Sequence, residues 1–186
     1  MFGFFKKVGN FFLDLVETVV IAFSIFIIIY LFLFQPHQVR GSSMYPSFFD
    51  KEYILTDKVS YRFGQPERGN VIIFRAPKNP TYDYIKRIIC EPDEECKIEN
   101  GKVYVNGQLL NESYLPSDTF TTGGNFARNG QKITVPVEHY FVLGDNRSHS
   151  SDSRDWGFVP KENIVGHAWI RYWPPNRAGI IKAPEY

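Results

Sequence analysis

Two residues that lie far apart in the chain could together perform a hydrolysis. Ser43 lies in a Gly-Ser-rich segment, residues 39–46, and Lys86 lies in an apolar stretch, residues 82–89. A serine hydroxyl becomes a nucleophile when a nearby base accepts its proton, and an uncharged lysine amine can be that base. A serine in such a segment is more often only a turn residue, and a strand lysine usually packs its stem and extends its ammonium into water. Neither residue alone therefore establishes catalysis.

Lys86 could act as a base only if its pKa were lowered. A lysine with a pKa of about 10.4 is uncharged in roughly one molecule per thousand near pH 7.4, so a useful base needs a pKa about three units lower. Burial can lower a lysine pKa by about 3 to 5 units because it disfavours the charged form. Side chains alternate along a strand, so Tyr84 and Ile88 share a face with Lys86 and are compatible with its burial.

The familiar serine hydrolase patterns do not fit Ser43. The nucleophile elbow needs a glycine two residues after the serine, where Tyr45 stands, and the penicillin-binding pattern needs a lysine three residues after it, where Pro46 stands. A third segment, residues 142–160, is rich in serine, aspartate and arginine and is too polar for a strand. We interpret it as a structured polar loop.

Composition excludes other classes of site. The chain has 21 Lys and Arg against 20 Asp and Glu, a net charge of +1, which argues against a nucleic-acid binder with a broad basic surface. The histidines show no metal-ligand spacing, so no metal site or cofactor is expected: they are His37, His139, His149 and His167.

The first part of the chain is expected to cross a membrane. Residues 18–34 carry no charge and would form a helix roughly 26 Å long, which approaches the thickness of a bilayer core once residues 15 and 16 are added. A buried core helix would show a polar stripe, but residues 19–34 are apolar on every face apart from Ser24 and Tyr30. A cleaved secretory signal would end in small residues, which are absent here. We therefore predict a permanent anchor, residues 16–35, after a short cytoplasmic or interfacial segment, residues 1–15.

The charges that flank this helix indicate its orientation. Lys6 and Lys7 precede it and Arg40 follows it. Because cytoplasmic flanks are enriched in Lys and Arg, the N-terminus is expected inside the cell. Residues 36–186 would then form one extracytoplasmic domain, with a flexible surface loop at about residues 119–132.

That domain is expected to be mainly β. Short β-branched and aromatic runs separated by turn residues predict strands at residues 53–56, 71–74, 84–89, 103–105, 133–135, 140–143 and 164–170. Asn100-Gly101 and Asn106-Gly107 predict two-residue hairpin turns, because both central positions of a type I′ turn need a positive φ. No long helical pattern follows residue 34.

In this order, directly after an apolar anchor, the three segments closely resemble the bacterial type I signal peptidases, membrane serine proteases that remove signal peptides from exported proteins. The resemblance covers most of residues 16–173. It is carried by Gly-x-Ser-Met-x-Pro at residues 41–46, Tyr-Ile-Lys-Arg at 84–87, and Gly-Asp-Asn-Arg with Ser-x-Asp-Ser-Arg at 144–154. It implies a domain of antiparallel sheets on the outer face of the cytoplasmic membrane, held by one transmembrane helix.

The resemblance implies a role for each site residue. Ser43 would be the nucleophile, Lys86 its general base, and the reaction would pass through an acyl-enzyme. Ser150 would hydrogen-bond the Lys86 amine, while Asp152 and Arg154 would form an ion pair that stiffens the loop. The alternative for that pair is a surface contact of about 0 to 1 kcal/mol.

The resemblance also implies how substrate and oxyanion are bound. The Ser43 backbone N–H would meet the oxyanion; some family members add a serine hydroxyl where this chain has Gly41. The signal peptide would bind as an added strand, and shallow apolar pockets would select small side chains at the first and third positions before the cut. The residues expected to contact it are Gln38, Val39, Met44, Asp83, Tyr84 and Ile85.

The chain departs from the family pattern at several turns, most clearly at residues 90–94, where Cys-Glu-Pro-Asp-Glu replaces Gly-Leu-Pro-Gly-Asp. Asp50 follows Phe49 where Gly-Asp is common in the family, and Asn70 stands where Asp normally follows Gly69. Cys90 and Cys96 flank the altered turn. They either form a disulfide that stabilises by about 2 kcal/mol in an oxidising exterior, or are two small buried apolar residues.

Two other functions remain as alternatives. One is a catalytically silent, membrane-anchored domain that binds signal peptides, which the presence of Lys86 disfavours. The other is a self-cleaving repressor protease, which would carry a soluble DNA-binding segment where this chain has its apolar run. The expected partners are signal-peptide-bearing precursors and the lipid bilayer, and not nucleic acid. The sequence does not indicate the oligomeric state.

Overall fold

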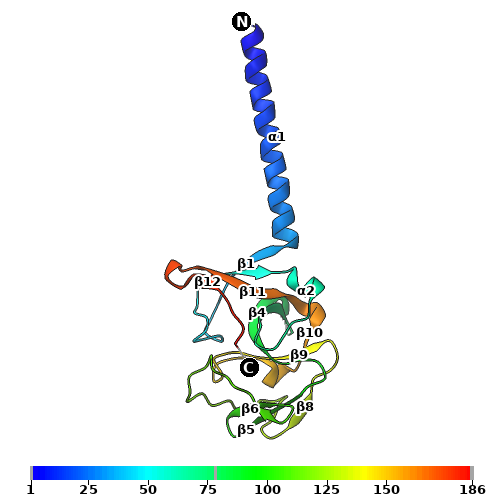
Figure 1. The fold of residues 1–186 in the computed structure, drawn as a ribbon, viewed down its shortest axis with the longest axis vertical. Coiled ribbons are helices and arrows are strands. Elements are labelled where there is room, and N and C mark those ends of the chain that lie inside the picture. The colour runs from blue at the N-terminus through cyan, green and yellow to red at the C-terminus, as the bar shows by residue number, and fades with distance from the viewer. Residues whose placement is uncertain (1, 78, 185–186) are drawn as a thin grey trace.

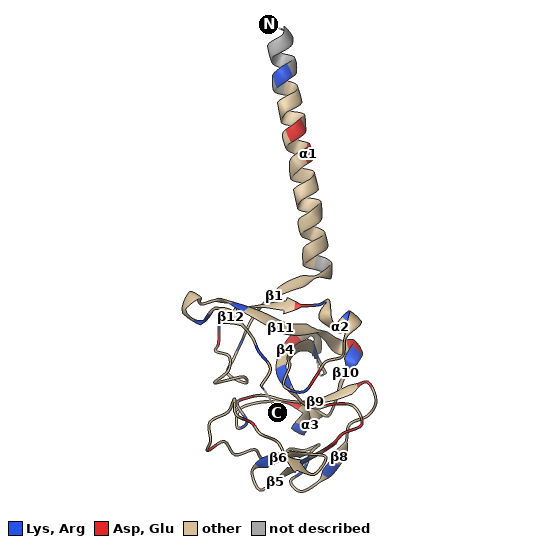
Figure 2. Ribbon diagram, in the orientation of Figure 1, with Lys and Arg blue, Asp and Glu red and all other residues tan. Residues whose placement is uncertain are grey.

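A long helix projects from a β domain (Figure 1). The computed structural model describes residues 2–77 and 79–184, and helix α1 spans Phe2–Phe32. Its segment Gly9–Tyr30 has a mean hydropathy of 2.5 and none of it is buried. Figure 2 shows few charged residues along it. This helix is long and apolar enough to cross a membrane.

The larger sheet is antiparallel throughout. Its strand order is β1-β2-β11-β3-β4-β9-β10, and β12 pairs with β11. The strands span Phe34–Gln38 (β1), Tyr53–Asp57 (β2), Val71–Ala76 (β3), Asn79–Cys90 (β4), His139–Leu143 (β9), Val159–Pro160 (β10), Ile164–Trp173 (β11) and Gly179–Ile180 (β12). The expected mainly β fold of antiparallel sheets with an N-terminal apolar helix is confirmed.

A smaller antiparallel sheet, in the order β7-β6-β5-β8, lies at the end of the β domain opposite α1 (Figure 1). Its strands span Glu95–Glu99 (β5), Lys102–Val105 (β6), Gln108–Leu109 (β7) and Lys132–Thr134 (β8). The two predicted turns connect them, with φ of 50° at Asn100, 77° at Gly101, 51° at Asn106 and 79° at Gly107. Both hairpins are therefore confirmed.

Every predicted strand overlaps an observed one, but β1, β5, β7, β10 and β12 were not predicted. β1 contains Pro36 and polar residues, and β7, β10 and β12 are too short to show alternation. Among the described residues, four short helical segments connect the strands: α2 (Ser60–Phe63), α3 (Ser153–Trp156), η1 (Lys161–Asn163) and η2 (Pro175–Arg177).

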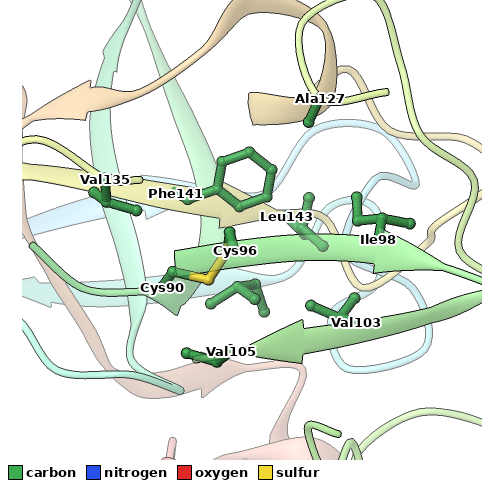
Figure 3. Close-up of a cluster of buried hydrophobic side chains, with 10 residues drawn as sticks. Cys90, Cys96, Ile98, Val103, Val105, Ala127, Val135, Phe141 and Leu143 are labelled. Atoms are coloured by element: carbon green, nitrogen blue, oxygen red, sulfur yellow. A yellow bond between two sulfur atoms is a disulfide. The ribbon is translucent and has the colours of Figure 1, made fainter. Parts of the chain in front are cut away.

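Apolar side chains pack on both faces of the larger sheet. One cluster includes Ile54, Ile73 and Met44, and another includes Ile72 and Phe74 on the opposite face of β3. A third cluster joins the two sheets (Figure 3). Within it, Cys90 of β4 and Cys96 of β5 form a disulfide with 6.2 Å between their Cα atoms.

Residues 119–131 form a loop that ends where β8 begins at Lys132. This loop is hydrogen-bonded to the polar loop, residues 142–160. The Phe126 and Ala127 N–H groups donate to the Arg154 carbonyl at 2.8 and 3.0 Å. Thr121 and Ala127 are buried. The loop therefore packs against α3 at these points.

Candidate active site

Ser43 and Lys86 lie within hydrogen-bond distance. The Lys86 Nζ is 2.9 Å from the Ser43 Oγ and donates to the Ile85 carbonyl at 2.8 Å. Ser43 lies in a turn that follows β1, and the buried side chains of Met44 and Phe48 hold that turn in the core. Lys86 lies on β4 opposite Ile72 of β3. Residues far apart in the chain thus form one pair.

The surroundings of Lys86 favour the uncharged amine. Its side chain is 4% exposed. Burial lowers the pKa of Lys86 to about 8, while the negative charges of Asp152 and Asp145 act in the opposite direction. With such a pKa roughly a fifth of the amines are uncharged near pH 7.4. Burial therefore shifts the pKa of Lys86 in the direction that a general base requires.

The polar loop holds the Ser43 turn through Asn146. The Asn146 N–H donates to the Ser43 carbonyl at 3.0 Å, and its side-chain amide donates to the Ser42 carbonyl at 3.0 Å. Sequence reasoning did not identify Asn146, although it lies within the Gly-Asp-Asn-Arg motif. These two bonds fix the loop against the backbone that carries the nucleophile.

Ser150 does not make the hydrogen bond that we expected from the resemblance. Its Oγ is buried, and no hydrogen-bond partner for it lies within the described part of the chain. It packs closely against Gly144, where a Cβ atom would lie only 2.2 Å from it. The Lys86 amine instead donates to Ser43 and to its own strand. Ser150 therefore lies beside Gly144, close to the backbone of the Ser43 turn.

Asp152 and Arg154 form the expected ion pair, and it is buried rather than on the surface. Arg154 Nε and Nη2 donate to the two Asp152 carboxylate oxygens at 2.7 and 2.8 Å, and the side chains are 6% and 0% exposed. Asp152 also caps α3 and accepts the Gly144 N–H at 3.0 Å. Charge-assisted, bidentate bonds of this kind hold a fixed geometry. The pair therefore supports the loop from inside.

A second buried ion pair lies beside Lys86 and was not predicted. Arg87 Nε and Nη2 donate to the Asp145 carboxylate at 2.9 and 2.7 Å, and Arg87 Nη1 donates to the Gly69 carbonyl at 2.8 Å. An arginine in an apolar strand was the available signal, because such a charge needs a buried partner. The pair attaches the polar loop to β4 next to the base.

The backbone N–H of Ser43 itself makes no hydrogen bond among the described residues. The Gly41 N–H donates to Asp50 Oδ1 at 2.8 Å, and Gly41 has a φ of +82°. Within residues 2–77 and 79–184, no hydrogen bond uses the Ser43 N–H. Gly41 has no side chain, so it provides no hydroxyl donor. The backbone N–H is thus free to meet an oxyanion.

A cavity of about 260 Å³ adjoins the pair, between two strand edges. β1 pairs only with β2, and β9 pairs with β4 only from Arg87 onward, so residues 79–86 have an unpaired edge in the described chain. The cavity is lined by His37, Gln38, Val39, Arg40, Ser43, Ile54, Ile73, Asp83, Tyr84, Ile85, Lys86 and Ser151.

All but one of the residues expected to contact substrate line this cavity. The exception is Met44, which is 1% exposed and packs in the core rather than on the cavity wall. In the part of the chain that the structure describes, no three His, Cys, Asp or Glu side chains form a group that could hold a metal ion.

Comparison with known proteins shows which family this chain resembles. Residues 12–173 match the family model described as signal peptidase, peptidase S26. The chain is 37% identical over 177 residues to a probable signal peptidase I-2 from Synechocystis sp., which covers 92% of this chain and 78% of that protein. It is 34% identical over 173 residues to signal peptidase IB from Staphylococcus aureus, covering 87% and 90% respectively.

A crystal structure of a signal peptidase I from Enterococcus faecalis matches with a TM-score of 0.48 and 32% identity, covering 56% of this chain and 97% of that chain. The family match extends over most of the chain and includes all three motif segments. The chain therefore belongs to the signal peptidase I family of serine endopeptidases, peptidase S26.

Proposed function

We propose that this protein removes signal peptides from exported precursors by a Ser43–Lys86 acyl-enzyme mechanism, cutting after small residues. One observation carries the proposal: a buried amine with a pKa of about 8 lies 2.9 Å from a serine hydroxyl, at the wall of a cavity. An amine poised near the working pH can accept and return a proton.

The reaction would begin when uncharged Lys86 takes the Ser43 proton and Ser43 Oγ attacks the scissile carbonyl. The Ser43 N–H would donate to the developing oxyanion. The Lys86 ammonium would then protonate the leaving amine, which releases the mature protein and leaves the acyl-enzyme. Lys86 would next deprotonate a water that attacks the ester, and its proton would return to Ser43.

The substrate would bind as an extended strand between β1 and β4. Both edges that face the cavity have unpaired backbone groups in the described chain, and an extended peptide can satisfy such groups on both of its sides. Gln38 would pair with the peptide from one side and residues 83–85 from the other, while Val39, whose backbone groups already bond to Glu52 and Lys51, would contact it through its side chain. Asp152 and Arg154 would keep the polar loop in place.

Helix α1 would anchor the enzyme in the cytoplasmic membrane. Its exposed apolar surface supports this role, and Lys6 and Lys7 before the span, against Arg40 after it, favour a cytoplasmic N-terminus. Residues 1–15 would be the inner segment, 16–35 the span and 36–186 the outer catalytic domain. A tag at either end, tested for accessibility on intact cells, determines the sidedness: only the C-terminal tag should react.

The proposed mechanism is tested with the full chain in detergent and a precursor with small residues before its cut. Ser43→Ala and Lys86→Met should each lower cleavage by about 10³-fold or more, because each removes a member of the pair. Ser42→Ala is the matched control, since Ser42 is exposed and its side chain makes no hydrogen bond among the described residues. Cleavage that stays normal in Ser43→Ala or Lys86→Met would contradict the mechanism.

A further inference from the structure

The floor of the cavity beside Ser43 is apolar. Val39, Ile54 and Ile73 belong to one buried cluster, and Ile85 packs against it. Ile73 of β3 lies directly opposite Ile85 of β4, so their side chains share a face of the sheet. These side chains come from strands on both sides of the cavity and form a continuous apolar surface.

Farther from Ser43 the same floor becomes polar. Since side chains of a strand alternate, the residues two positions before Val39 and Ile85 share their faces, and these are His37 and Asp83. Thr56 likewise shares the face of Ile54, two positions away. His37 Nδ1 is 2.8 Å from Thr56 Oγ1, and His37 Nε2 is 3.2 Å from Asp83 Oδ2. We name these three residues the polar floor.

The polar floor has acceptor capacity left for a ligand. Among the described residues, the Asp83 carboxylate accepts one hydrogen bond, which comes from His37. An ionised carboxylate offers about four acceptor sites. The Asp83 side chain is 32% exposed and lines the cavity, as does His37 at 15%. An apolar group placed over this carboxylate would take water from it without replacing the hydrogen bond.

A peptide strand between β1 and β4 would present every second side chain to this floor. The side chain at the first position before the cut would then lie over the apolar surface, and the one at the third position over the polar floor. We propose that His37 and Asp83, with the fully buried Thr56 holding the His37 ring, form a polar subsite that selects a hydroxyl side chain, Thr or Ser, over an apolar one of equal size at the third position. This inference rests on the proposed function, and it replaces the apolar pocket that the family resemblance implied at the third position.

The contrast between Thr and Val tests the subsite because the two side chains have nearly the same shape. A Thr hydroxyl can donate to Asp83, whereas Val would cover the carboxylate without a hydrogen bond. One hydrogen bond to a charged group corresponds to roughly a tenfold preference or more. We therefore expect kcat/KM for a peptide with Thr at the third position to exceed that for the Val peptide by about tenfold.

His37→Phe removes the donor that orients Asp83 and replaces a polar ring of the floor with an apolar one, and Asp83→Ala removes the acceptor itself. In both variants the Thr-to-Val ratio of kcat/KM should fall toward one. His139→Phe is the matched control, because it makes the same substitution at a histidine outside the cavity lining, and its ratio should stay at the wild-type value. A second peptide pair, with Ala or Ser at the first position, should show a ratio that His37→Phe does not change.

The outcomes separate the two proposals. If the wild-type enzyme cleaves both peptides equally, or if His37→Phe keeps the wild-type preference, the polar subsite is wrong and the Ser43–Lys86 mechanism stands. If neither peptide is cleaved, or Ser43→Ala cleaves both, the proposed function fails and the subsite with it. If His37→Phe does not fold, Asp83→Ala provides the same reading, since it removes the acceptor.

Discussion

At the scale of single residues, Lys86 combines burial with nearby negative charge. Burial disfavours its ammonium, whereas Asp152 and Asp145 favour it, and burial is the larger effect. The result is a pKa of about 8 against an ordinary value of 10.5. An amine of this kind is a proton acceptor under conditions where exposed lysines are charged.

This pKa predicts how activity depends on pH. Because only the uncharged Lys86 amine can accept the Ser43 proton, kcat/KM should rise through about pH 8 and level off above it. The measurement is the pH profile of kcat/KM for one peptide between pH 6 and 10.5. A profile whose only rise centres near pH 10.5 would show that the reactive amine has the pKa of a solvent-exposed lysine. That result would exclude Lys86 as the general base.

The same pKa predicts an effect on stability. The folded pKa lies below the unfolded one, so the cost of a buried ammonium is complete below about pH 8 and disappears as the pH rises to 10.5. Lys86→Met should therefore raise the free energy of unfolding at pH 7, by up to about 3 kcal/mol, and this gain should vanish near pH 10.5. Urea unfolding at both pH values measures it. The exposed Lys102→Met is the control, and an equal gain for both variants would contradict the prediction.

At the scale of elements, the polar loop determines where Ser43 lies. Asn146 holds the Ser43 turn, Asp145 attaches the loop to β4, and Asp152 caps α3. Arg147 continues this network by pairing with Glu112 and donating to the Thr121 hydroxyl at 2.8 Å. The loop is thus held at several points, which suits an element that must place a nucleophile accurately.

Gly144 lies where this loop packs tightly against the backbone of the nucleophile. A Cβ at this position would lie 2.2 Å from Ser150 Oγ and 2.4 Å from the Ser43 carbonyl oxygen, so backbone would have to move. Gly144→Ala should lower kcat by about 100-fold, since a displacement of about 1 Å can cost that much. Gly179→Ala, where a Cβ meets nothing within 4 Å, is the control. Full activity in a folded Gly144→Ala variant would refute this close packing.

At the scale of the whole molecule, the Cys90–Cys96 disulfide connects the two sheets. Cys90 ends β4, which carries Lys86, and Cys96 lies in β5 of the smaller sheet. Both residues belong to the buried cluster that the sheets share (Figure 3). A covalent bond here supports the packing that joins the smaller sheet to the catalytic one.

The disulfide predicts how the protein responds to a reductant. Reduction should lower the free energy of unfolding of the wild-type protein by about 2 kcal/mol, the value for a short closed loop. A Cys90→Ala/Cys96→Ala variant should be insensitive to reductant, which controls for other effects. Thiol titration after denaturation without reductant should find none, and two reactive thiols would exclude the bond.

Much of the fold could be predicted because it depends on short stretches of chain. The Asn-Gly turns follow from a φ preference of two residues, the central strands from β-branched runs, and α1 from a long uncharged segment. Ser43 and Lys86 were identified from motifs of a few residues each. Such features need little information from the rest of the chain.

Only the tertiary structure decided what surrounds the Ser43–Lys86 pair. Asn146 on the Ser43 turn, the Arg87–Asp145 pair, the unbonded Ser150 and the buried Met44 depend on how the polar loop folds back onto β4. The polar floor arises because β1, which the sequence did not predict, lies across the cavity from β4. Contacts between segments far apart in the chain depend on the curvature and register of the whole sheet, which no local pattern of residues encodes.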